Sequence, residues 1–399
     1  MKKTFRRISE RFVQGIFTLS GSMTSIVILL IVVFLFKEGL GLFRSPDIEK
    51  GYALCVHVSN PVERLHPKEV KSVFDSETVN WQDLGGNDEE ITLFRFDEIF
   101  SLYSDEELGD DYSLLPQKLG EVIGQNRGII AFLPEKYLPA DDSRVKILRT
   151  ENISPVDFFA GTEWMPTITP APLFGSLPLI LGTLWVSIFA ILIALPPGLG
   201  VAIYMSELAG ERTRKLLKPT IELLAGIPSV VYGFFGLVTL VPLIQNTLHL
   251  PVGETALAGS LILAIMALPT IITIAEDAMR NTPKSMREAS LALGATHWQT
   301  IYRVVIPYAR SGISAAVVLG VGRAVGETMA VMMVTGNAAV MPGSLFESVR
   351  TIPATIAAEL GEAPSGGTHY QSLFLLGCIL FVITMIISVT AEMISKKTP

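Results

Sequence analysis

Charged residues are scarce in this chain of 399 residues: Asp, Glu, Lys and Arg make up 17% of it, against roughly 25% in soluble domains. Cysteine is almost absent, and Cys55 and Cys378 lie in an acidic segment and an apolar run, so no internal disulfide is expected. The chain also lacks a Gly-x-x-x-x-Gly-Lys-Ser/Thr phosphate loop, and its apolar runs carry no His-Glu metal pattern and no serine–lysine arrangement. These absences argue against an ATP-hydrolysing site, a bound metal or cofactor, and an enzyme of another kind.

Apolar residues are abundant instead, at 49% of the chain, and they gather in six runs long enough to cross a bilayer. The runs cover residues 16–36, 173–205, 219–244, 255–275, 311–336 and 371–394. No small-residue cleavage pattern follows the first run, so it is expected to stay as a span after a short N-terminus, 1–15. The sequence therefore predicts an α-helical polytopic membrane protein, with one helix at 16–36 and five within 173–399.

Lys and Arg are distributed unevenly among the segments that connect these runs. The N-terminus has five, residues 211–218 have four, residues 278–310 have five, and the C-terminus has two. The alternate connections, 245–254 and 337–370, have none and one. By the positive-inside tendency, both termini are expected in the cytoplasm.

The connection between the first two runs, residues 37–172, is long and acidic. It holds 13 Lys or Arg against 25 Asp or Glu, a balance of −12. Short apolar runs such as YALCVHV, ITLFRF and GIIAFLP alternate in it with helical stretches at 67–74 and 114–123. This alternation is typical of an α/β lobe, and the orientation above places the lobe outside the cytoplasm.

Arg323 and Glu327 are the charged residues of the otherwise apolar or small run 311–336, and Arg323 is the only Lys or Arg in any of the six runs. In one continuous helix they would project from nearly the same face and could neutralise one another. Inserting a lone charge at the centre of a membrane helix costs roughly 2.5–3.5 kcal/mol, so a structural or functional role must compensate for these two charges. It is either a structural staple between helices or an anion station, in which the guanidinium binds an oxyanion and the carboxylate holds it otherwise.

The connection 278–310 contains the sequence NTPKSMREASLALGATHWQTIYRVVIP. Thr282 and Pro283 are a favourable helix start, and Gly294 permits a bend after the helix. By itself this pattern suits either a surface helix lying on the membrane or a helix that docks a partner.

The same stretch resembles the EAA loop of bacterial ABC-import permeases. There, Glu-Ala-Ala is followed by a glycine and, thirteen residues later, by a proline. Here Glu288 and Ala289 precede Gly294 and Pro307, with Ser290 in place of the second alanine. The resemblance implies a type I permease fold and a coupling loop that sits on a separate ATP-binding subunit. The residues it assigns to coupling are Arg287, Glu288, Ala289 and Gly294.

Three further stretches resemble the membrane subunits of bacterial phosphate importers: residues 218–237, 322–331 and 351–363. The resemblance implies inorganic phosphate as the transported anion, with Arg323 and Glu327 in its pathway. It also implies three partners in the bacterial inner membrane: a second permease subunit, an ATP-binding subunit and an extracytoplasmic phosphate-binding protein. No nucleic-acid partner is expected.

Two other functions stay open from the residues alone. Permeases for sulfate or molybdate share the coupling loop, so the identity of the anion rests on the resemblance. A transmembrane sensor could use the acidic lobe as its receptor, but it would need a cytoplasmic signalling domain. The longest cytoplasmic piece expected here is the loop 278–310.

The acidic lobe has a resemblance of its own. Residues 60–96 and 123–134 are similar to part of a phosphate-binding protein. That family follows the strand ending in arginine, here Arg95, with a Ser-Gly-Thr that grips the anion, whereas this chain has Asp97 and Glu98 there. We therefore expect a lobe that no longer binds phosphate and that caps the pathway or docks a partner. A tethered receptor is the alternative.

Overall fold

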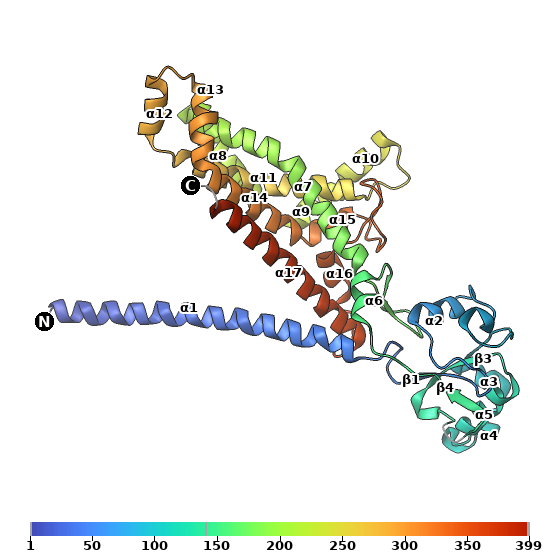
Figure 1. The fold of residues 1–399 in the computed structure, drawn as a ribbon. Helices are drawn as coiled ribbons and strands as arrows, with labels where there is room; N and C mark the ends of the chain where they lie inside the picture. Colours follow the sequence, from blue (N-terminus) through green and yellow to red (C-terminus); the bar gives the residue numbers. More distant parts are fainter. Residues whose placement is uncertain (1, 140–141, 397–399) are drawn as a thin grey trace. The chain divides into compact units, whose positions relative to one another are not determined.

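The computed structural model of the chain describes residues 2–139 and 142–396 (Figure 1). The chain folds into two compact units. One contains the apolar helices and covers 1–40, 176–363 and 370–399, and the other contains the insertion and covers 41–175 with 364–369. Each unit has its own hydrophobic core. Cys55 and Cys378 are both free and buried.

Six helical segments among the described residues are long and apolar enough to span a membrane, which confirms the predicted polytopic fold. They are Gln14–Arg44, Leu177–Leu208, Ser229–Leu248, Ala256–Arg280, His297–Val325 and Thr368–Thr390. The first consists mainly of α1 (Lys2–Leu40), and the last belongs to α17 (Thr368–Lys396). Phe34 of α1 packs edge-on against Phe374 of α17, with ring centroids 5.5 Å apart.

Three of the segments contain a π-helical turn, a feature that inserts an extra residue into the helical repeat. The second segment is α7 (Leu177–Ile203) followed by the turn η6 (Tyr204–Leu208). The third joins α9 (Ser229–Phe235), η7 (Gly236–Leu240) and α10 (Val241–Leu248). The fifth joins α13 (His297–Thr300), η8 (Ile301–Val305) and α14 (Ile306–Val325). The shorter helices are α8 (Glu211–Ala225), α12 (Lys284–Ala292), α15 (Met329–Val334) and α16 (Ile352–Glu359).

Helix α11 (Ala256–Arg280) is the most deeply buried of the six segments, with 61% of its most apolar stretch buried inside the unit. It packs against α7 and α14. Small residues permit this close packing: a Cβ on Gly320 of α14 would lie 3.0 Å from Ile271. The hydroxyl of Ser260 donates to the carbonyls of Ala256 (2.7 Å) and of Val186 on α7 (3.2 Å). Helix α11 is thus the centre of the unit that contains the apolar helices, which is called the membrane unit below.

The fifth segment differs from the sequence-based expectation of one helix through 311–336. Helix α14 ends at Val325, and a new helix, α15, begins at Met329. The composition of the run gives no sign of this break, because residues on both sides of it are equally apolar. The prediction of a continuous helix over this run is therefore wrong.

The insertion is an α/β unit, as its sequence predicts, while its side of the membrane stays a prediction. A four-stranded sheet has the order β2-β3-β1-β4, in which β2 is parallel to β3 and the other pairs are antiparallel. The strands are β1 (Tyr52–His57), β2 (Thr92–Arg95), β3 (Ile129–Pro134) and β4 (Val145–Ile147). The helices are α2 (Pro67–Phe74), α3 (Ile99–Leu102), α4 (Asp105–Leu108), α5 (Leu115–Gln125) and α6 (Pro155–Ala160). A hairpin of β5 (Trp164–Met165) and β6 (Leu173–Phe174) completes the unit.

Both faces of this sheet are buried, because successive side chains of a strand point to opposite sides. Leu54 and Val56 of β1 belong to a core with Val70 and Val73 of α2. Cys55, between them, belongs to a second core that includes α5. The sheet therefore lies between two helical layers.

The burial of Asp47 in this unit predicts a pH-dependent stability. Its side chain accepts a hydrogen bond from the Glu151 backbone N–H (3.2 Å), and the residue is 8% exposed. Burial raises the pKa of Asp47 from 3.8 to about 6. The folded state therefore favours protonated Asp47. The contribution of this carboxyl group to the free energy of unfolding is fully present below pH 3.8 and is lost as the pH rises through about 6.

We therefore expect Asp47→Asn, which keeps an oxygen acceptor but cannot ionise, to stabilise the insertion by about 1–2 kcal/mol at neutral pH and not in acid. Thermal unfolding of the full-length chain, followed by tryptophan fluorescence, measures this difference. Glu77→Gln, at an exposed position on the same unit, is the control. Equal unfolding temperatures of Asp47→Asn and wild type at neutral pH would contradict the prediction.

Candidate functional site

Arg323 lies in the last turn of α14 and is half-buried. Its Nη1 donates to the Thr270 hydroxyl of α11, at 3.2 Å. Among the described residues this is its one side-chain hydrogen bond, although a guanidinium has five N–H donors. Most of its donors are therefore free to bind another group.

Glu327 does not pair with Arg323, and the expected neutralising pair is wrong. Gly326 follows the end of α14, so the two residues do not share one helical face. The ion pairs among the described residues do not include this one. Instead, a Glu327 carboxylate oxygen accepts from the Ala330 N–H (3.5 Å) at the start of α15, where a negative charge suits the helix dipole.

The turn between α14 and α15 lines an open groove of about 510 Å³. Gly326 and Thr328 form one part of it, and residues of α16, among them Pro353 and Ile356, form another. The stretches 322–331 and 351–363, which the sequence singled out separately, therefore meet here. Apart from Thr328, the residues that line this groove are apolar or glycine, so it offers no charged group to an anion.

The residues of the predicted coupling loop form a helix followed by a bend, as the sequence predicts. Helix α12 begins directly after Pro283 and ends at Ala292. Gly294 has a φ of +85°, the left-handed conformation that glycine adopts without strain. The hydroxyls of Ser290 and Thr300 share a hydrogen bond of 3.0 Å that closes the loop onto α13.

One side of this loop faces outward. Glu288 and Ala289 are exposed, and so are the apolar side chains of Leu293 (89% exposed) and Trp298 (59%). Exposed apolar residues next to charged ones are typical of a protein-binding surface.

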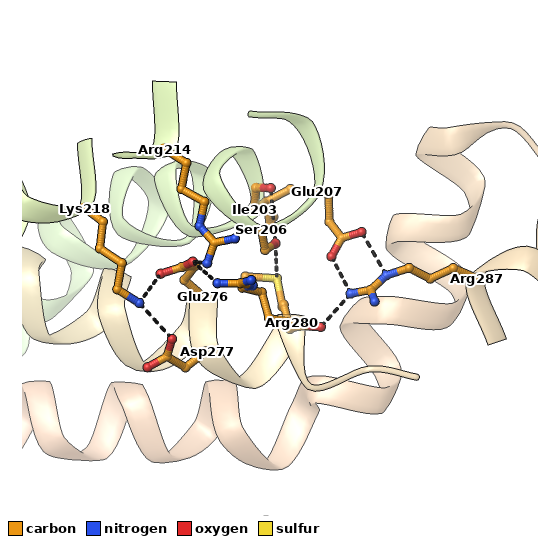
Figure 2. Close-up of polar contacts among 10 residues, drawn as sticks. Ile203, Ser206, Glu207, Arg214, Lys218, Glu276, Asp277, Arg280 and Arg287 are labelled. Carbon is orange, nitrogen blue, oxygen red and sulfur yellow. Dashed lines mark hydrogen bonds and ion pairs between the residues drawn. The ribbon is translucent and has the colours of Figure 1, made fainter. Parts of the chain in front are cut away.

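Arg287, assigned to the same function, points the other way. Its guanidinium forms a two-bond ion pair with Glu207 of η6, with Nη2–Oε1 at 2.8 Å and Nε–Oε2 at 3.2 Å (Figure 2). It also donates to the carbonyls of Thr282 (2.6 Å) and Met279 (2.9 Å), at the end of α11. Arg287 thus fastens α12 to the membrane unit.

A second ionic cluster lies beside this clamp and was not anticipated from the sequence. Glu276 of α11 is fully buried, and its carboxylate is contacted by Arg214 (2.5 Å) and Lys218 (3.1 Å) of α8 and by Arg280 (3.8 Å) (Figure 2). Burial disfavours the charged form of Lys218, but its hydrogen bonds to Asp277 and Glu276 outweigh this and raise the pKa of Lys218. Two adjacent carboxylates at the end of the fourth apolar run, opposite the basic stretch 211–218, were the available signal.

Residues 198–398 match the family model described as binding-protein-dependent transport system inner membrane component. The chain is 43% identical to the probable ABC transporter permease protein YqgH of Bacillus subtilis over 245 residues, which is 61% of this chain and 79% of that protein. It is 42% identical to the phosphate transport system permease protein PstC of Mesorhizobium japonicum over 254 residues, 59% of this chain and 76% of that protein.

A solved structure of a putative phosphate ABC transporter substrate-binding protein from Clostridium perfringens is 25% identical, covers 31% of this chain and 50% of that chain, and aligns with a TM-score of 0.18. The likeness of the insertion to a phosphate-binding protein stays a prediction.

The left-handed backbone at Gly294 generates a prediction for the coupling loop. A Cβ there would meet no atom within 4 Å, so the cost of a substitution comes from the backbone alone. We expect Gly294→Val to destabilise the loop by about 1–2 kcal/mol and Gly294→Asn to be tolerated, because asparagine adopts this conformation readily. Hydrogen–deuterium exchange of residues 284–300 measures the difference. Slow exchange in both variants, equal to wild type, would contradict it.

Proposed function

Because the chain belongs to the family of binding-protein-dependent transport system inner membrane components, we propose that it forms the translocation pathway of an ATP-driven importer of inorganic phosphate. The observation that carries the proposal is the 42% identity to a phosphate transport permease over 76% of that protein. The six apolar segments agree with it. The chain is a transport subunit, and ATP is hydrolysed on a separate subunit.

Arg323 is the proposed contact for the anion in the pathway. It is half-buried, it is the one basic residue in the six sequence runs, and its single hydroxyl partner leaves most of its donors free. A planar guanidinium suits the oxygens of phosphate. Glu327 stays in the proposed pathway as the residue that caps α15 directly after this contact.

Three partners complete the proposed importer: a second permease subunit resembling PstA, an ATP-binding subunit resembling PstB and an extracytoplasmic phosphate-binding protein resembling PstS. The exposed side of α12, with Glu288 and Ala289, supports the contact with the ATP-binding subunit. The distribution of Lys and Arg supports an orientation with both termini in the cytoplasm and the insertion outside it, in the bacterial inner membrane.

The insertion is proposed to serve as a docking or gating element that does not bind phosphate. After β2 the chain makes one tight turn at Phe96–Glu98 and then the four-residue helix α3. Asp97 and Glu98 are exposed in that turn. Carboxylates there repel an anion, and so short a helix offers it no row of free N–H groups.

The role of Arg323 is tested by uptake of labelled phosphate into vesicles that contain the assembled importer. We expect Arg323→Gln to lower the rate at least about tenfold, since a charged hydrogen bond to the anion is lost. Arg323→Lys should also be slow, because an ammonium lacks the planar fork. Arg310→Gln, which removes an exposed guanidinium from the same helix, α14, is the matched control and should match wild type. Normal uptake by both Arg323 variants would exclude this contact, and competition by sulfate or molybdate would change the assigned anion.

The insertion is tested on the full-length chain by hydrogen–deuterium exchange with and without millimolar phosphate. We expect unchanged exchange for residues 92–102, because Asp97 and Glu98 leave no place for the anion. Protection of this stretch that saturates with phosphate would make the insertion a tethered receptor instead.

A further inference from the structure

We propose that Glu207 and Glu276 are positioning residues that carry the movement of the coupling loop into α11, the helix whose Thr270 accepts a hydrogen bond from Arg323 of α14. This inference rests on the proposed function, since it assigns the coupling of ATP hydrolysis to transport. It concerns two carboxylates whose side chains are almost completely buried, at 9% and 0% exposed. They act through Arg287 on one side and through α8 on the other (Figure 2).

The first step is the clamp at Arg287. Its guanidinium makes four hydrogen bonds: two to the Glu207 carboxylate and two to backbone carbonyls at and just after the end of α11. The side chain of Glu207 is only 9% exposed and that of Arg287 21%. Water therefore screens this pair poorly, and its planar geometry resists sliding. A displacement of α12 must then move the end of α11 and η6 with it.

The second step is the buried carboxylate of Glu276. A fully buried charge is costly unless cations compensate it, and here Arg214 and Lys218 come from a different helix, α8. Lys218 also binds Asp277, the next residue of α11, at 3.1 Å. Helix α8 and the end of α11 therefore move as one body, because separating them would leave charges unpaired.

The third step is the connection to the anion contact. Thr270, which accepts the hydrogen bond from Arg323, precedes Glu276 by six residues of the same helix, about 9 Å along its axis. The residues between them include Ile271, Ile272 and Ala275, all buried. A packed helix of this kind transmits a shift of one end to the other. The ionic cluster and the Arg323 contact are thus two points on one rigid element.

Burial separates these two carboxylates from ordinary surface charges on the same helices. Glu211 of α8 also forms an ion pair, with Lys215 at 3.6 Å, but the two side chains are 91% and 80% exposed. Such exposed pairs contribute little. Glu211→Gln is therefore a matched control on the same helix.

The test uses the importer assembled with its partner subunits in vesicles, with phosphate uptake and ATP hydrolysis measured on the same sample. We expect Glu276→Gln and Glu207→Gln to assemble and to hydrolyse ATP, while the number of ATP molecules used per phosphate rises on the order of fivefold or more. Glu207→Asp, which keeps a carboxylate, should restore part of the coupling. Glu211→Gln should match wild type.

The ratio of hydrolysis to uptake distinguishes coupling from a purely structural role. If the carboxylates only hold the fold together, both activities fall in parallel with the amount of assembled complex and the ratio stays constant, which overturns the proposal. An unchanged ratio in stable complexes overturns it as well. If Glu276→Gln does not assemble, Lys218→Met, which leaves Glu276 paired with Arg214, must show the raised ratio. Failure of the wild-type complex to take up phosphate contradicts the proposed function itself, independently of the variants.

Discussion

The carboxylate of Glu276 is fully buried, so the folded membrane unit exists only with cations placed against it. Helix α8 supplies two of them, and Arg280 adds a third from the next turn of α11. The same requirement joins Glu207 to Arg287. Because these charges come from four different elements, compensating them brings η6, α8, α11 and α12 together at one end of the unit. Ion pairs therefore hold the helices together at this end of the unit, where their apolar packing ends.

Arg323, unlike these cations, is not paired with a carboxylate among the described residues. Arg287 and Arg214 are bound to carboxylates, whereas the one side-chain partner of Arg323 within the described part of the chain is the Thr270 hydroxyl. A carboxylate partner would compete with an incoming anion, and a neutral hydroxyl competes much less. The separation of Glu327 from Arg323 by the break after Val325 has the same effect. The cations that fix the structure and the cation available to a ligand are thus distinguished by their partners.

The core of the insertion depends neither on the buried ion pairs nor on the Arg323 contact of the membrane unit. Its sheet is covered by α2 on one face and by α5 on the other, so its apolar residues are buried within the unit itself. Where a phosphate-binding protein would need N–H donors after β2, the chain instead has a short turn with two carboxylates. The insertion is therefore predicted to be a stable fold without an anion site.

Local patterns in the sequence predicted the six apolar segments, the helix between Pro283 and Gly294, and strands β1, β2 and β3 of the insertion, because each depends on neighbouring residues. The break after Val325 was not predicted, since the run 311–336 is apolar or small apart from Arg323 and Glu327, and the end of the helix at Val325 is seen only in the structure. The tertiary structure alone decided the charge clusters: Arg214 and Glu276 are 62 residues apart, and Glu207 and Arg287 are 80 apart. Each of these residues reads as an ordinary surface charge in its own segment, and only the packing of the helices removes the water that would otherwise make the pairs weak.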